Sequence, residues 1–471
     1  MNETPKQKEI EISSDTFTKQ GREHESFITS HGLIIIGLVI LSIIAGFGLV
    51  FLPQKYQLSL VFLFPVAVIV FLIIRNPYLG LFVFILIDYA RPQYFIPQLR
   101  VFKLGVAITV LTIISFIIQL VVTKKKIYWD RFNWTYLFFI AIIGVSVLTA
   151  SNNYRAFVIF QLMLTTFIIY FMATNLIKTS ENLGKLIWMM LAVHLFFSIK
   201  GILEGGYAGG TLMGDENDFA LALNTMVPFA FFIFTNSENL FKKYFSLIIL
   251  ISLILGVISS MSRGGWVGLV AVLFFCILKS NRKLLSFSLI IILALIAFMF
   301  APPEYWDEIK TISDTHESTA ATRLNYWEAA VRMFLEHPII GVGADNGGFQ
   351  MPHYVSGFAN PLTQWGRTFH GTLPQVLAEM GILGFGSYIA MIIMAILYLR
   401  RIIASTLFPQ NSNWKIYANS ILGGIIGYLA TATFLSTAFY PQLWTMFLFS
   451  VVLKRSYDIK VSSISEITPE I

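Results

Sequence analysis

The sequence predicts an all-α polytopic membrane protein with about 12–14 transmembrane helices and one large extracytoplasmic loop that contains an amphipathic helix. Two observations predict this class. Of the 471 residues, 56% are hydrophobic and only 13% are charged, whereas soluble domains are about 25% charged. Apolar runs of about 20 residues also recur along the chain, and each is long enough to cross a bilayer as a helix.

Each predicted span is an apolar run bounded by polar or basic residues. The run 77–89 is short enough to be re-entrant. We therefore expect a tail at 1–30, transmembrane helices in 31–301 and 373–454, an extracytoplasmic loop at 302–372 and a tail at 455–471. The predicted spans are 31–52, 57–74, 77–89, 104–122, 134–150, 154–177, 183–203, 219–234, 245–260, 264–278, 284–300, 373–399, 414–433 and 439–453.

Basic residues in short loops predict the orientation, because such loops stay in the cytoplasm. The strongest cluster is Lys124-Lys125-Lys126, which places both termini inside. The segment 91–103 is basic yet falls outside, so it fits less well. We expect a bacterial cytoplasmic membrane protein whose site faces the periplasm or the outer surface. The polar residues that map to that external side are Arg155, Asp215, Asn217, Asp218, Arg263, Arg323, Arg367 and His370.

Arg263 lies between two apolar runs and is followed by Gly264 and Gly265, which predicts the tight turn of a helical hairpin. Glycines allow a ligand to approach the backbone closely. An arginine at membrane depth is costly unless it faces a cavity or a partner. The alternative is an arginine that extends to lipid headgroups.

The segment 322–337 predicts an amphipathic helix that Pro338 ends, because the residue before proline disfavours the helical conformation. Arg323 lies on the edge of its apolar face. Arg332 is about 180° round the helix, so the two arginines cannot bind the same anion. The alternative is a helix that lies on the membrane surface. The apolar positions are Leu324, Trp327, Val331 and Phe334.

His370 precedes a helix expected to start near Thr372, with Pro374 in the first turn where proline is tolerated. The positive end of the helix dipole disfavours an imidazolium. A neutral histidine can accept a proton, as a general base must. The same helix end attracts phosphate, and Arg367 lies three positions earlier.

Asp215, Asn217 and Asp218 open another span. Two interpretations stay open: the acidic residues cap the helix, or the group hydrogen-bonds sugar hydroxyls and orients Arg263. Metal binding is the less favoured option. Glu379, about two turns into the helix after His370, either pairs with an arginine or bridges helices.

Other motifs exclude several classes. The stretch Gly341-Val342-Gly343 breaks the dinucleotide-binding pattern, and Walker-type and zinc-protease motifs are absent from the sequence. Cys276 is the only cysteine, which excludes disulfides and cysteine zinc sites. We therefore expect no cofactor, no metal and no nucleic-acid partner.

Over residues 214–388 the sequence resembles the O-antigen ligase/O-antigen polymerase superfamily. The resemblance rests on the order and spacing of several motifs. One departure is Gly371, where members often have asparagine, so the acceptor contacts can differ. The motifs are Asn217-Asp218-Phe219-Ala220, Ser262-Arg263-Gly264-Gly265-Trp266, Arg323 with Trp327 and His337-Pro338, and His370 with Gln375, Glu379, Gly381 and Gly384.

The resemblance implies a metal-independent, inverting glycosyltransferase of the GT-C type. Its donor would be a glycan on undecaprenyl pyrophosphate, and its acceptor a hydroxyl of lipid A–core or another surface molecule. His370 would activate that hydroxyl. Arg263 and Arg323 would hold the pyrophosphate, and we expect Arg367 and Arg155 to assist. The residues expected to bind or orient the substrate are Asp215, Asn217, Asp218, Trp327 and Glu379.

Three functions remain open, and the ligase is favoured because one external loop dominates. A polymerase that extends the chain on the lipid carrier is the alternative within the superfamily. A transporter of lipid or polysaccharide belongs to another class; internal repeats would favour it, and the two halves of the sequence show none.

Overall fold

A computed structural model describes residues 66–97, 99, 103–124, 126–208, 214–300 and 318–467. The chain divides into two compact units, 1–76 and 77–471. The described part of the first holds the helix Val66–Arg75. The predicted tail 1–30, the predicted span 31–52, the start of the span 57–74 and residues 301–317 of the polar loop lie outside the described residues. The following description concerns the second unit.

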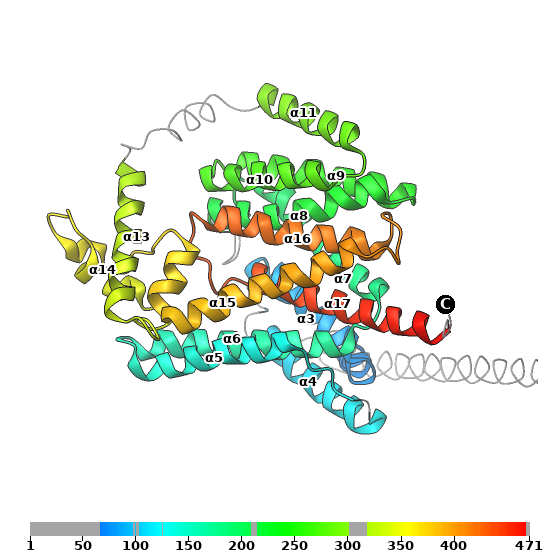
Figure 1. The fold of residues 1–471 in the computed structure, drawn as a ribbon, viewed down its shortest axis with the longest axis horizontal. Coiled ribbons are helices and arrows are strands. Elements are labelled where there is room, and N and C mark those ends of the chain that lie inside the picture. The colour runs from blue at the N-terminus through cyan, green and yellow to red at the C-terminus, as the bar shows by residue number, and fades with distance from the viewer. Residues whose placement is uncertain are drawn as a thin grey trace, which may run out of the picture. The chain divides into compact units, whose positions relative to one another are not determined.

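The described part of this unit is built from helices (Figure 1). Each span predicted from residue 77 onward coincides with one of them. The polar segment before α15 holds two further helices and a short 3-10 turn. The helices are α3 (Pro77–Ala90), α4 (Leu104–Thr123), α5 (Arg131–Thr149), α6 (Asn153–Leu176), α7 (Ser180–Leu203), α8 (Glu216–Asn236), α9 (Leu240–Ser259), α10 (Arg263–Lys279), α11 (Lys283–Phe300), α13 (Ser318–Glu336), α14 (Gly347–Tyr354), α15 (Thr372–Ala404), α16 (Asn413–Ala432) and α17 (Pro441–Ile467), with the 3-10 turns η1 (Pro92–Tyr94) and η4 (Pro361–Gln364).

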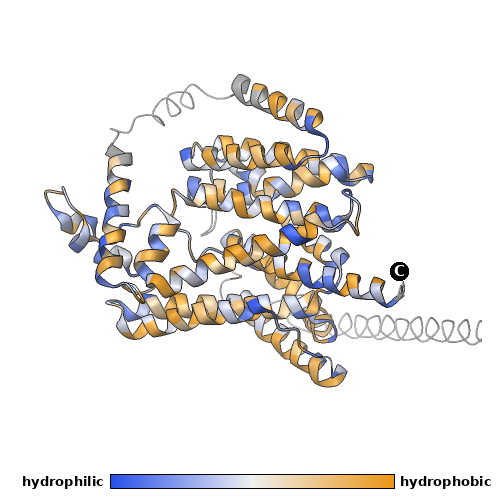
Figure 2. Ribbon diagram, viewed as in Figure 1, coloured by the Kyte–Doolittle hydropathy of each residue, from blue (hydrophilic) through white to orange (hydrophobic). Residues whose placement is uncertain are grey.

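The helical membrane class is confirmed. Among the described residues, seven helices are long and apolar enough to cross a membrane. Hydrophobic residues cover most of the bundle helices, whereas hydrophilic residues are more frequent on α13 and α14 (Figure 2). The total of 12–14 spans stays a prediction.

Helix α8 forms the centre of the bundle, with 94% of its most apolar window buried. A helix that is apolar on all sides is stable only when neighbours surround it. Glycines of α16 let that helix approach closely: a Cβ at Gly424 would lie 2.8 Å from the carbonyl oxygen of Thr225, and a Cβ at Gly427 would lie 2.8 Å from that of Asn224. The absence of side chains at these glycines therefore lets α16 pack closely against α8.

Helix α15 is broken at Gly381, where the backbone has φ 59° and ψ −166°. The stretch 338–343 lies beside the break and bonds to it through the backbone. Val342 donates to the carbonyl of Ala378 at 3.0 Å, and two amides just after the break donate back at 2.8 and 3.3 Å. A Cβ at Gly381 would lie 2.5 Å from the carbonyl carbon of Ile339, so glycine is required there. The polar segment is thereby fastened to α15.

Helix α13 is confirmed and ends at Glu336, and the side chains that it buries are not those of the apolar pattern in the sequence. Leu324 and Val331 are 61% and 47% exposed. The side chains that pack inward are instead Tyr326, Ala329, Ala330 and Met333. The reason is physical: lipid tails are as apolar as leucine, so at a membrane boundary hydrophobicity does not mark the buried face.

Candidate active site

His370 lies immediately before α15, whose N-cap is Gly371, and its backbone has a positive φ of 49°. The predicted helix start at Thr372 is confirmed. Trp327 Nε1 of α13 donates to the carbonyl oxygen of His370 at 3.3 Å. The ring of Tyr326 stacks on the imidazole, with centroids 6.2 Å apart and 20° between the planes. Helix α13 therefore holds His370 by its backbone and by one face of its ring.

The electrostatic environment favours a neutral imidazole. Burial lowers the pKa of His370, the positive charges of Arg323 and Arg367 lower it further, and the negative charge of Asp215 opposes them. Arg323 lies on α13, Arg367 lies in the loop before α15, and Asp215 is the residue that caps α8. Their charges all act at one histidine, so the structure brings together four of the residues that sequence analysis predicted.

Arg263 is the first residue of α10 and follows the turn after α9, as the predicted hairpin requires. Ser262 fixes this turn. Its hydroxyl accepts a hydrogen bond from the amide of Gly265 at 3.0 Å and donates to Oδ1 of Asn217 at 2.7 Å. Arg263 therefore begins a capped helix at the same end of the bundle as the start of α8.

Phe434, in the loop between α16 and α17, contacts both arginine-bearing helices. The guanidinium carbon of Arg323 lies 5.9 Å from the centroid of its ring. A Cβ at Gly264 would lie 3.3 Å from the Cβ of Phe434. Phe434 is thus close both to Arg323 and to the residue that follows Arg263.

The rest of the 433–440 loop is fastened to the same helix ends. The hydroxyl of Thr372, at the start of α15, donates to the carbonyl oxygen of Leu435 at 2.6 Å. Tyr440 donates its hydroxyl to Oδ2 of Asp218 at 3.1 Å. Sequence analysis placed this loop outside but assigned it no part in the site, because it has no charged residue or histidine.

The acidic group at the start of α8 has a capping role. Asp215 accepts hydrogen bonds from the amides of Asn217 at 2.8 Å and Asp218 at 3.4 Å. The capping interpretation is therefore confirmed for Asp215. The other two side chains bond to Ser262 and Tyr440, so they also join α8 to its neighbours. Binding of sugar hydroxyls by this group stays a prediction.

Arg155 and Glu379 lie in a second polar group. Arg155 Nη2 is 2.6 Å from Oδ2 of Asp345. Burial raises the pKa of Asp345, and Arg155 opposes that rise. Glu379 accepts hydrogen bonds from the amides of Asp345 at 3.1 Å and Gly347 at 3.2 Å. Glu379 therefore joins α15 to the polar segment, one of its two predicted roles, and a role for Arg155 in donor binding stays a prediction.

A cavity of about 270 Å³ lies between α3, α6 and α17. Apolar side chains line most of it, including Leu162, Ile169 and Trp444. Tyr440 lines it as well, and the same side chain reaches Asp218 at the start of α8. The cavity therefore extends to the edge of the polar site.

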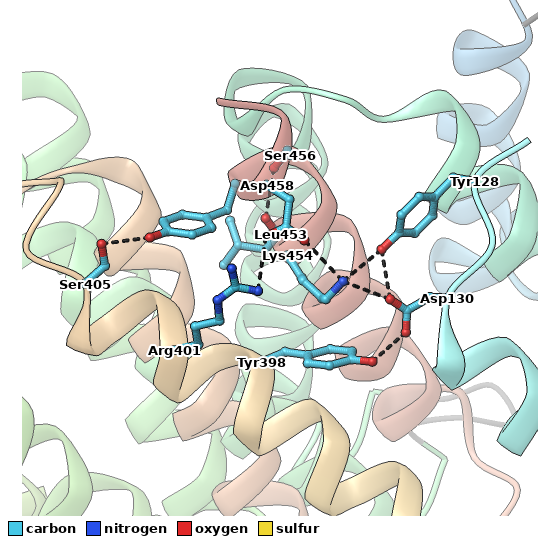
Figure 3. A network of polar contacts seen from close by, with 10 residues as sticks. Tyr128, Asp130, Tyr398, Arg401, Ser405, Leu453, Lys454, Ser456 and Asp458 are labelled. Carbon is cyan, nitrogen blue, oxygen red and sulfur yellow. Dashed lines mark hydrogen bonds and ion pairs between the residues drawn. The ribbon is translucent and has the colours of Figure 1, made fainter. Parts of the chain in front are cut away.

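A separate ion-pair cluster joins the start of α5 to the C-terminal part of α15 and the middle of α17 (Figure 3). Lys454 Nζ lies 2.9 Å from Oδ2 of Asp130 and 3.2 Å from Oδ2 of Asp458. Tyr398 donates to Oδ1 of Asp130 at 2.5 Å. Burial raises the pKa of Asp130, but hydrogen bonds from the Phe132 amide, Tyr398 and Lys454 outweigh it and lower the pKa overall. The cluster joins segments that the basic-loop pattern predicts on one side of the membrane.

In the part of the chain that the structure describes, no group of three or more His, Cys, Asp or Glu side chains is placed to hold a metal ion. The polar residues around His370 are mainly cationic and suit an anionic ligand, since guanidinium groups pair with phosphate through two hydrogen bonds.

Comparison with known protein families gives a match over part of the chain. A family model described as O-antigen ligase matches residues 246–389, a stretch that includes Arg263, Arg323 and His370. The residues that cap α8 and the 433–440 loop lie outside it. No curated protein matches the chain. The segment 246–389 is therefore similar to the O-antigen ligase family.

Proposed function

We propose that this protein is an inverting, metal-independent glycosyltransferase at the outer face of a bacterial cytoplasmic membrane. It transfers a glycan from undecaprenyl pyrophosphate to an acceptor hydroxyl. The family supports an O-antigen ligase or polymerase-type glycosyltransferase. The donor, the acceptor and the roles of individual residues are our proposal.

His370 acts as the general base in this reaction. It takes the proton of the acceptor hydroxyl as the acceptor oxygen attacks the anomeric carbon of the donor sugar. The bond from that carbon to the pyrophosphate oxygen breaks on the opposite face, so the configuration inverts. The undecaprenyl pyrophosphate leaves with the bonding electrons, and its new negative charge is stabilised by Arg263, Arg323 and Arg367.

The observation that carries the proposal is the position of His370, which Trp327 and Tyr326 hold just before the start of α15. Burial and then Arg323 and Arg367 lower its pKa, and a base has to be unprotonated to accept a proton. In this proposal the same two cations bind the pyrophosphate. A positioned base contributes roughly 10²–10⁴ in rate, and preorganised charge at the leaving group is typically the largest catalytic contribution.

The cavity beside Tyr440 supports a lipid-linked donor. A polyprenyl chain needs an apolar path next to the headgroup site, and this cavity of about 270 Å³ is mainly apolar. Its polar neighbour Asp218 lies within the acidic group at the start of α8, which suits a substrate with an apolar chain and a polar head.

A ligase is favoured over a polymerase because one polar segment, with α13 and α14, dominates the external part of the chain. Both reactions use the same base and the same leaving group. They differ in the acceptor, which is a surface molecule for a ligase and a second lipid-linked glycan for a polymerase. Incubation of the purified protein with both acceptors separates them by the product formed.

The test is transfer by His370→Ala in a reconstituted assay with a lipid-linked donor. We expect a loss of about 10²–10⁴ in rate. The matched control is His353→Ala, because His353 is an exposed histidine on α14 in the same polar segment, and we expect full activity. Unchanged transfer by His370→Ala would show that His370 is not the base.

A further inference from the structure

Phe434 is an aromatic residue placed between the two helices that supply the predicted pyrophosphate-binding arginines. Its ring centroid lies 5.9 Å from the guanidinium carbon of Arg323. The ideal Cβ of Gly264 would lie 3.3 Å from its Cβ and 3.4 Å from its Cδ2. A cation over an aromatic face within about 6 Å is attracted by the ring quadrupole, so the ring attracts Arg323 while its Cβ and Cδ2 lie close to Gly264, the residue after Arg263.

The backbone around Phe434 is fixed from three sides. Its amide donates to the carbonyl of Thr431 at 3.2 Å, and the hydroxyl of Thr431 accepts from Nδ2 of Asn224 at 3.0 Å. Nδ2 of Asn224 also donates to the carbonyl oxygen of Gly265 at 2.8 Å. The end of α16 is therefore tied to α8 and to the first turn of α10. The backbone at Phe434 is therefore fixed relative to α10, whereas α13 belongs to the polar segment before α15.

The position relative to His370 completes the arrangement. Leu435 accepts the hydroxyl of Thr372 at 2.6 Å, and Thr372 is two residues after His370. The loop that carries Phe434 is thus joined to the helix start that carries the base. The start of α10, the start of α15 and α13 all meet at this loop.

We infer that Phe434 is a positioning residue, which holds Arg323 by a cation–π contact beside Arg263 so that both can bind one pyrophosphate. This inference rests on the proposed function. Phe434 makes no charged contact with the substrate, and it acts through the guanidinium of Arg323. The aromatic face is required, because an aliphatic side chain of similar size fills the space but has no quadrupole.

The test is binding of glycan-free undecaprenyl pyrophosphate to the purified full-length protein, with fluorinated phenylalanines at position 434. Fluorine withdraws electron density from the ring face and changes its shape little. We expect Kd to rise stepwise with one, two and three fluorines. Phe434→Leu is expected to raise Kd about 2-fold to 30-fold, and Phe434→Trp to retain binding, since tryptophan has the strongest cation–π face.

Two controls separate this inference from the proposed function. Phe241→Leu changes a 75% exposed phenylalanine at the start of α9, far along the chain from the loop, and should leave Kd unchanged. Arg323→Ala should weaken binding. If Arg323→Ala binds normally, the phosphate role of Arg323 is wrong. If Arg323→Ala weakens binding but Kd is flat across the fluorinated series, only the positioning role of Phe434 is wrong.

Discussion

His370 is held by its backbone and by one face of its ring. Trp327 donates to its carbonyl oxygen and Tyr326 stacks on the imidazole. The contacts that the described residues make with it therefore leave its ring nitrogens to a substrate. Its positive φ of 49° is an uncommon conformation for a residue with a Cβ, and such conformations persist where the surrounding structure determines them. The base is thereby oriented before the acceptor binds.

The pH dependence of transfer follows from the charges around this base. Because burial, Arg323 and Arg367 lower the pKa of His370, the acidic limb of kcat/KM is expected below the ordinary histidine pKa of about 6.5. Activity falls as the pH falls through the pKa, since the protonated base cannot act. Arg367→Gln removes one positive charge, so we expect the limb to move to higher pH.

The matched control for this profile is Arg332→Gln. Arg332 lies on α13 but pairs with Glu328 at 2.5 Å and is not among the charges that act on His370. The acidic limb of kcat/KM for Arg332→Gln should lie at the same pH as that of the wild type. A limb that stays in place in Arg367→Gln would contradict the electrostatic role assigned to Arg367.

Arg263 provides a second prediction at this scale. Arg263→Lys keeps the charge but loses the planar pair of donors that matches phosphate oxygens. We expect weaker donor binding, by about 5-fold to 100-fold for the loss of one charge-assisted hydrogen bond. Titration with undecaprenyl pyrophosphate measures the change. Donor binding equal to that of the wild type would exclude a two-point contact at Arg263.

The individual residues of the site were only partly predictable from sequence. His370, Arg323 and Arg367 were candidates from sequence because titratable residues beside apolar runs are conspicuous. Phe434 and Tyr440 were not, because aromatic residues are frequent throughout this chain and their role depends on which helix ends meet. Arg155 was grouped with the other arginines by its expected side of the membrane, yet it pairs with Asp345, since side alone does not determine proximity.

At the scale of elements, the break in α15 determines how the polar segment is attached. The stretch beside Gly381 replaces the missing helical hydrogen bonds with backbone bonds to 338–343. Glu379, two residues before the break, accepts hydrogen bonds from the amides of Asp345 and Gly347. The segment that carries α13 is therefore positioned by the same helix that begins two residues after His370.

We expect Gly381→Ala to weaken the attachment of the polar segment to α15. The φ of 59° with ψ of −166° is accessible almost only to glycine and costs a residue with a Cβ about 1–3 kcal/mol, to which the contact with Ile339 adds. We expect a lower Tm and reduced transfer. Gly386→Ala on the same helix is the control, because a Cβ there meets nothing within 4 Å and alanine favours a helix. Equal Tm values for the two variants would show that the break is not needed.

Helix positions could be predicted well from sequence, because apolar runs of bilayer length allow few other structures. The break in α15 could not, since Gly381 sits within an apolar run and its need for a positive φ depends on the 338–343 stretch. The buried face of α13 could not be predicted for a related reason. Its apolar side chains Leu324 and Val331 are exposed, and lipid or protein can each accommodate them.

At the scale of the whole second unit, polar groups gather at two separate regions of the bundle. Tyr398 is 17 positions after the break at Gly381, which corresponds to about 26 Å of continuous helix at 1.5 Å per residue. The His370 region contains Arg323 and Arg367, whose positive charges lower the pKa of His370. The region around Asp130 instead pairs its charges internally (Figure 3). We therefore expect the first to support catalysis and the second to support stability.

Asp130→Asn tests this division. The Lys454 and Asp130 side chains are 18% and 6% exposed, so the substitution leaves a largely buried ammonium with a weaker partner, and we expect a loss of about 1–3 kcal/mol. Thermal unfolding of the purified protein measures it, with donor affinity expected to be unchanged. Glu328→Gln breaks the exposed pair with Arg332, whose side chains are 59% and 41% exposed, and should change stability by less than about 0.5 kcal/mol.

The stabilisation by Asp130 also depends on pH. Because the pKa of Asp130 is lowered, its stabilisation is complete above the ordinary carboxyl pKa of about 3.9 and is lost as the pH falls below it. A Tm for Asp130→Asn as high as that of Glu328→Gln would mean that the cluster does not hold α5, α15 and α17 together.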